Sequence, residues 1–132
     1  MNIYKIIVVC VFLGLSSCDR MHREIVESRP LDLKFSEQCL ATYLKTDPSL
    51  EYHSYQPDHN GQAYHLVYRR NQDIIFSGQP MNIWAGIKRD LNGQKKLIFM
   101  TGWNELSNDK VRHKKVNAIL EDLKDKITRK CF

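Results

Sequence analysis

The sequence predicts one α+β domain in which a helix, an antiparallel meander of four to five strands and a second helix form two layers. Three observations support this fold. The length of 132 residues and the 42% hydrophobic content are typical of a single globular domain. Residues 50–101 contain alternating segments separated by glycine-containing turns, which indicates hairpins. The flanking segments 36–47 and 107–128 carry apolar residues at helical spacing.

The first helix is expected to begin at Ser36, whose hydroxyl can accept a hydrogen bond from a backbone amide of the first turn. Phe35 and Leu40 flank this cap as a hydrophobic staple. The helix should end at Asp47, because Pro48 disfavours helical geometry in the residue before it.

Five strands are predicted after this helix. They span residues 50–56, 62–70, 73–77, 82–89 and 94–101. The first two form a hairpin through the sequence PDHNG, and the last two form a hairpin through the sequence DLNG. The Asn-Gly pair in each turn supplies the positive φ values that a tight hairpin needs.

Alternation divides the side chains of the first hairpin between two faces. The expected core face carries Leu50, Tyr52, Tyr64, Leu66 and Tyr68. The expected outer face carries His53, Tyr55, Ala63 and His65.

Two histidines of this outer face, His53 and His65, are the candidate metal ligands. With a five-residue loop they stand opposite each other, and nearby Glu51 completes a possible zinc or copper site. A two-residue turn would instead place His53 opposite Tyr68 and remove the pairing. Two histidines without a third ligand usually belong to a solvated sheet face, so no metal or other cofactor is predicted.

The last helix is expected to start at Ser107, with Leu106 and Val111 as a staple-like pair, and to run to about Thr128. One arc of about 100° forms its core-facing stripe. That arc contains Val116, Ile119, Leu120, Leu123 and Ile127.

The first twenty residues have the features of an export signal. Residues 1–5 carry one positive charge, and residues 6–15 are an apolar stretch without charges or amides. This stretch is too short to cross a bilayer, which needs about 20 apolar residues. The following sequence Leu15-Ser16-Ser17-Cys18 resembles the lipobox of bacterial lipoprotein precursors. The alternative is an ordinary signal peptide that is cut at the same place.

The resemblance implies that the Cys18 sulfur receives a diacylglyceryl group, that the signal is removed just before it and that the new amino terminus is acylated. Two or three chains anchor a protein stably at ~0.8 kcal/mol per buried methylene. The chain then divides into a signal peptide (1–17), a lipidated cysteine with a tether (18–30) and a periplasmic domain (31–132). In enteric bacteria an aspartate after the lipidated cysteine, here Asp19, favours the inner membrane over the outer one.

Two cysteines remain once Cys10 is removed with the signal and Cys18 is lipidated. In an oxidising compartment Cys39 and Cys131 are predicted to form a disulfide. Closing a loop of about 90 residues would contribute ~4–5 kcal/mol. The alternative is a reactive thiol at Cys39, since the first turn of a helix lowers thiol pKa.

Charge is unevenly distributed along a chain whose net charge is +5. Residues 18–85 carry 7 positive and 9 negative side chains, whereas residues 86–132 carry 12 and 6. A dense cluster lies in the first half of the last helix and consists of Lys110, Arg112, Lys114 and Lys115. Export separates the domain from nucleic acid, so an anionic lipid surface or an acidic protein is the expected partner of this cluster.

Aromatic residues are the second candidate contacts, because exposed Tyr and Trp are favoured at binding hot spots. Tyr55 is expected on the outer face of the first hairpin, and Trp84 and Trp103 lie at or near strand ends, with one of the two tryptophans exposed. The sequence contains no Gly-x-Ser-x-Gly elbow, His-Glu-x-x-His pair or glycine-rich phosphate loop.

These observations predict a membrane-anchored envelope lipoprotein that binds another protein without catalysis, as an inhibitor, immunity factor or assembly accessory. Two alternatives remain open. The first is a small hydrolase or metal-dependent enzyme around His53 and His65. The second is a structural envelope tether that contacts peptidoglycan or lipid head groups.

Overall fold

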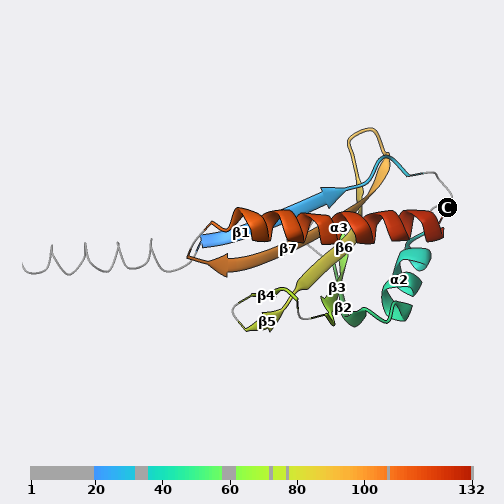
Figure 1. Ribbon diagram of the computed structural model, residues 1–132. Helices are drawn as coiled ribbons and strands as arrows, with labels where there is room; N and C mark the ends of the chain where they lie inside the picture. Colours follow the sequence, from blue (N-terminus) through green and yellow to red (C-terminus); the bar gives the residue numbers. More distant parts are fainter. Residues whose placement is uncertain are drawn as a thin grey trace, which may run out of the picture.

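The computed structural model describes residues 20–31, 36–57, 62–71, 73–76, 78–106 and 108–131. It confirms a single α+β domain, in which one face of a five-stranded antiparallel sheet is covered by two helices (Figure 1). Expectations for Cys18, for Phe35 and for the turn at 58–61 fall outside the described residues. The elements are β1 (Arg20–Glu27), α2 (Glu37–Thr46), β2 (Leu50–Pro57), β3 (Ala63–Arg69), β4 (Ile75–Phe76), β5 (Gln79–Pro80), β6 (Asn82–Arg89), β7 (Lys95–Glu105) and α3 (Lys110–Cys131).

The main sheet has the strand order β1-β7-β6-β3-β2. Four of its strands, β2, β3, β6 and β7, form the predicted meander. The short strand expected over 73–77 does not belong to it, because β4 pairs with β5 in a separate two-stranded sheet. Gly78 explains this arrangement: its φ of 76° allows the tight turn that folds β5 back onto β4.

The largest correction concerns residues 20–27, which were expected in a tether and instead form the edge strand β1. This strand pairs with β7 from Arg20 opposite Glu105 to Glu27 opposite Ile98. Its residues alternate as those of a strand should. His22 and Val26 are buried and Glu24 between them is half-buried, whereas Met21, Arg23, Ile25 and Glu27 are exposed. β7 is accordingly longer than predicted.

An irregularity in β2 reverses the expected faces of β3. The register shifts between Tyr52 and Ser54, which leaves His53 as the extra residue of a bulge and sets Tyr55 opposite His65. Leu50 and Tyr52 lie on the core side as expected. The prediction for β3 is wrong, because a shift of one residue exchanges the two faces of a strand. Tyr64, Leu66 and Tyr68 lie on the face without helices, and His65 and Val67 lie beneath the helices.

The core lies between the helices and the sheet. The predicted stripe of α3 is confirmed, with Val116, Leu120, Leu123 and Ile127 buried and Ile119 partly buried. From α2, Leu40 and Leu44 are fully buried. The sheet contributes Val26, Val67, Ile83, Ala85, Leu97 and Phe99.

The ends of α2 follow the local sequence signals. The Ser36 hydroxyl accepts a hydrogen bond from the amide of Cys39 at 3.2 Å, and the helix ends at Thr46, before Asp47 and Pro48. Both expectations are confirmed.

The start of α3 differs from the prediction. The helix begins at Lys110, and the Asp109 carboxylate accepts hydrogen bonds from the amides of Val111 at 3.0 Å and Arg112 at 3.1 Å. Asp109 therefore fills the capping role that was assigned to Ser107, which lies outside the described residues. The expected staple is absent, since Leu106 is 68% exposed and Val111 is 76% exposed.

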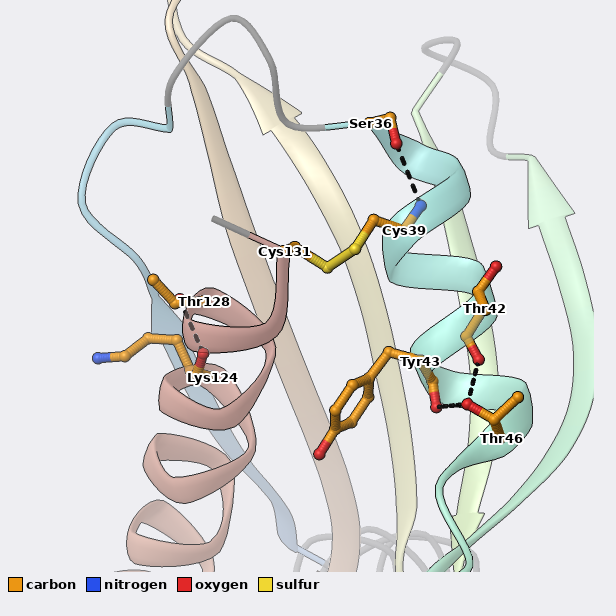
Figure 2. The surroundings of a disulfide bond; sticks show 8 residues. All are labelled: Ser36, Cys39, Thr42, Tyr43, Thr46, Lys124, Thr128 and Cys131. Carbon is orange, nitrogen blue, oxygen red and sulfur yellow. Dashed lines mark hydrogen bonds between the residues drawn. A yellow bond between two sulfur atoms is a disulfide. The ribbon is translucent and has the colours of Figure 1, made fainter.

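A disulfide joins Cys39 in the first turn of α2 to Cys131 at the end of α3, as predicted (Figure 2). The Tyr43 side chain extends from α2 toward α3 one turn further along (Figure 2). Burial, together with a hydrogen bond to Asp47, raises the pKa of Tyr43 to about 12. The disulfide and this packing hold the two helices together on the same face of the sheet.

Candidate protein-binding surface

The side chains that alternate with the core residues form a second surface, the helix-free face of the sheet. Four of them stand in one row across four strands. Trp84 pairs with Leu66 on one side and with Met100 on the other, and Met100 pairs with Ile25. Cross-strand neighbours on one face contact each other, so this row is a continuous apolar strip. Met21, Tyr64, Tyr68 and Ile98 extend it on the same face.

The burial pattern of β7 shows that this sheet is apolar on both faces. Leu97, Ile98 and Phe99 are consecutive and all buried, and Met100 is half-buried. Strands with apolar residues on both faces are typical of sheets that are covered on both sides. The helices cover one side. On the other side Leu66 and Ile98 are buried, whereas Met21 is 66% exposed and Ile25 is 47% exposed. An apolar patch of this kind marks an interaction site in many soluble domains.

A hollow of about 360 Å³ opens beside Trp84 on this face. Its lining includes Met21, Arg23, Trp84, Met100 and Gly102. Gly102 contributes to the space because it has no side chain. A Cβ added here would make only ordinary contacts, 3.5 Å from the His22 carbonyl oxygen and 3.6 Å from the Met21 sulfur. The hollow therefore combines an indole wall, a flexible thioether and one exposed guanidinium.

The two tryptophans lie on opposite faces. Trp84 is half-buried in the wall of the hollow and stays accessible to a partner. Trp103 is 4% exposed, stacks on Phe76 with ring centroids 4.8 Å apart, and donates a hydrogen bond to Glu105 at 3.1 Å. The prediction of Trp103 as a contact residue is wrong, because it occupies the core between β7 and β4.

Tyr55 is 48% exposed, as expected, but does not belong to the helix-free face. It lies in the edge strand β2, and its ring packs on His65 with centroids 4.8 Å apart, on the side of the helices. Tyr55 and Trp84 are therefore not parts of one surface.

The four residues of the predicted basic cluster differ in whether the protein itself already engages them. The Arg112 guanidinium forms an ion pair with Glu105 at 3.0 Å and lies over the Phe76 ring. Lys110, Lys114 and Lys115 are exposed. Three lysines thus remain for contacts with a partner.

The proposed histidine pair does not form. His53 lies at the bulge, where its ring contacts Tyr68, whereas His65 is 5% exposed beneath the helices and shares a 2.8 Å hydrogen bond with the Tyr52 hydroxyl. Burial lowers the pKa of His65 and favours its neutral form. Among the described residues, no group of three or more His, Cys, Asp or Glu side chains is arranged to hold a metal ion.

A polar network between β1 and α3 was missed by the sequence analysis. His113 Nδ1 lies 2.8 Å from a Glu24 carboxylate oxygen, and His113 Nε2 lies 3.1 Å from His22 Nδ1. The other nitrogen of His22 lies 3.2 Å from the carbonyl oxygen of Glu105. Asn117 donates to the second Glu24 oxygen at 3.3 Å. Residues 89 to 93 positions apart in the chain meet here, so no local pattern predicts the network.

This network fixes the position of β1. His22 and Glu24 point toward α3, and by alternation Met21, Arg23 and Ile25 point to the helix-free face. The contacts beneath the helix therefore hold one wall of the hollow in place.

No family model, curated protein or solved structure matches the chain. None of the helices in the described part of the chain is long and apolar enough to cross a membrane.

Proposed function

We propose that the protein is a bacterial envelope lipoprotein, anchored through acylated Cys18, whose domain binds another envelope protein through the helix-free face. The lipobox-like sequence supports the anchor, and Asp19 after the cysteine favours the inner membrane. The accessible part of the apolar row, from Trp84 to Ile25, with the hollow beside Trp84, is the observation that carries the binding role. The domain would face the periplasm and act as an inhibitor, immunity factor or assembly accessory.

The chemistry of the hollow describes the partner. A large apolar or aromatic side chain of the partner would fill the space beside Trp84. The Trp84 indole would supply much of the contact area once the partner covers it. Arg23 at the margin would pair with an acidic side chain of the partner. Lys88 already forms an ion pair with Glu27 at 3.4 Å on the same face, so Arg23 is the more available cation.

The first alternative loses the histidine pairing that suggested it. His53 and His65 lie on opposite faces of the sheet, which removes the basis for a metal-dependent site. The second alternative, a structural envelope tether, stays open, with residues 20–27 in β1 rather than in a linker.

The test is in-cell photo-crosslinking of the full-length protein from position 84, with position 91 as the control because Leu91 is fully exposed in the β6–β7 loop. We expect one envelope protein to crosslink from 84 and not from 91. Gly102→Val should abolish this crosslink by filling the hollow, while thermal unfolding stays unchanged, since valine suits a strand and its Cβ meets ordinary contacts.

Two results would contradict the proposal. An undiminished crosslink in Gly102→Val would remove the hollow from the binding site. An intact Met1 terminus and an unmodified Cys18, measured by mass spectrometry of the native protein, would remove the anchor.

A further inference from the structure

Three exposed apolar side chains gather where β1 and α3 begin. Met21 is 66% exposed, Leu106 is 68% exposed and Val111 is 76% exposed. Figure 1 shows that the start of β1, the end of β7 and the start of α3 lie at one end of the domain, opposite the C-terminal end of α3. We call this the basal end and define it by Met21, Leu106, Lys110, Val111 and Lys114.

The basal end also carries positive charge that no neighbour neutralises. Lys110 and Lys114 are exposed, and neither forms an ion pair within the described residues. The nearby carboxylates are already engaged, because Glu105 pairs with Arg112 and Asp109 accepts the first amides of α3. Lysine in the first turn also opposes the helix dipole, so Lys110 does not serve helix stability.

The chain leaves no room for a tether at this end. Only Asp19 separates Cys18 from Arg20, the first residue of β1. Two residues span at most about 7 Å. A lipid on Cys18 therefore holds the start of β1 at the level of the head groups.

We propose that the basal end docks on an anionic phospholipid surface. This inference rests on the proposed lipidation of Cys18 and adds a second contact to it. Leu106 and Val111 enter the interfacial zone, and Lys110 and Lys114 contact lipid phosphates. Acyl chains combined with basic residues give firmer attachment than either signal alone. The contact fixes the orientation of the domain, and it holds the hollow beside Trp84 close to the bilayer, facing sideways toward a membrane-associated partner.

The test uses the purified, lipidated full protein in vesicles that contain quencher-labelled lipids. An environment-sensitive fluorophore is attached at position 106 or at position 91, which lies at the opposite end of β7. In vesicles with phosphatidylglycerol the probe at 106 should lose most of its fluorescence, and the probe at 91 should keep it. In pure phosphatidylcholine vesicles the anchor alone holds this end near the bilayer, so the loss at 106 should be smaller than with phosphatidylglycerol.

Charge variants separate the basal lysines from lysine content in general. Replacing Lys110 and Lys114 by glutamine should weaken docking about fivefold for each charge removed. Arg129 and Lys130 are exposed in the last turn of α3, and replacing them by glutamine in the same way should leave the quenching unchanged.

The outcomes distinguish this inference from the proposed function. Lipidated protein with equal quenching at 106 and 91, or with equal quenching in both kinds of vesicle, overturns the docking and leaves the anchor intact. Protein whose Cys18 carries no lipid by mass spectrometry overturns both.

Discussion

The two faces of the sheet are made by alternate residues of the same strands, yet they differ in what covers them. Leu97 and Phe99 of β7 are fully buried beneath the helices. Met100 of the same strand points to the helix-free face, between Trp84 of β6 and Ile25 of β1. The disulfide and the His22–His113 network both lie on the helix-covered side. Stability therefore depends mainly on the helix-covered face, which leaves the accessible part of the other face, from Trp84 to Ile25, available for binding.

The disulfide is the strongest single contribution to the covered face. Its cysteines are separated by 92 positions in the sequence, so removing the bond with Cys39→Ser and Cys131→Ser should lower the free energy of unfolding by ~4–5 kcal/mol. Urea denaturation of both forms measures the loss. A change below about 1 kcal/mol would show that the two helices are held on the sheet without it.

A matched pair of truncations tests the difference between the faces directly. Phe99 is fully buried and Ile25, one strand away, is 47% exposed. Phe99→Ala should cost ~3–5 kcal/mol through the lost burial and the cavity, and Ile25→Ala at most about 0.5 kcal/mol. Chemical denaturation at neutral pH gives both values. If Ile25→Ala cost as much as Phe99→Ala, the helix-free face would be covered in the isolated protein.

Glu24 tests the network that positions β1. Glu24→Ala leaves His113 Nδ1 and the Asn117 amide without their partner, and should cost ~1–3 kcal/mol. Glu27→Ala is the control, because within the described residues Glu27 forms a surface ion pair with Lys88, worth about 0–1 kcal/mol. Amide exchange should accelerate in β1 of the first variant. Equal stability of the two variants would show that the network does not hold the strand.

Features that depend on neighbouring residues were predictable from the sequence. The Ser36 cap, the stop before Pro48 and the buried stripe of α3 each follow from side chains within a few positions of one another. The disulfide was predictable by elimination, since the proposed signal removal and lipidation of Cys18 would leave two cysteines.

Features that depend on distant partners were not predictable. The charged residues of β1 resemble a linker until β7 and α3 supply their partners, as Glu24 and His113 show. The bulge at His53 moves Leu66 to the helix-free face, because a single extra residue exchanges the faces of a strand. The candidate surface was therefore predicted only at Trp84, and its hollow depends on Gly102, which no motif marks.

The smallest effect expected is an acid sensitivity that belongs to the helix-covered face. Burial lowers the pKa of His65 below its ordinary value of 6.5, with a smaller contribution in the same direction from Lys45 and an opposing one from Glu37. The unfolded chain therefore binds this proton more readily than the folded one. The contribution of neutral His65 to stability is complete above about pH 6.5 and is lost as the pH falls through the pKa of His65 in the folded state.

One histidine variant tests this sensitivity. His65→Asn should flatten the dependence of unfolding free energy on pH between 7.5 and 5. Urea denaturation of the variant and the unsubstituted protein across this range measures both slopes. An unaltered slope in His65→Asn would assign the acid sensitivity to other groups, and acid would then not act on the covered face through the histidine beneath α2.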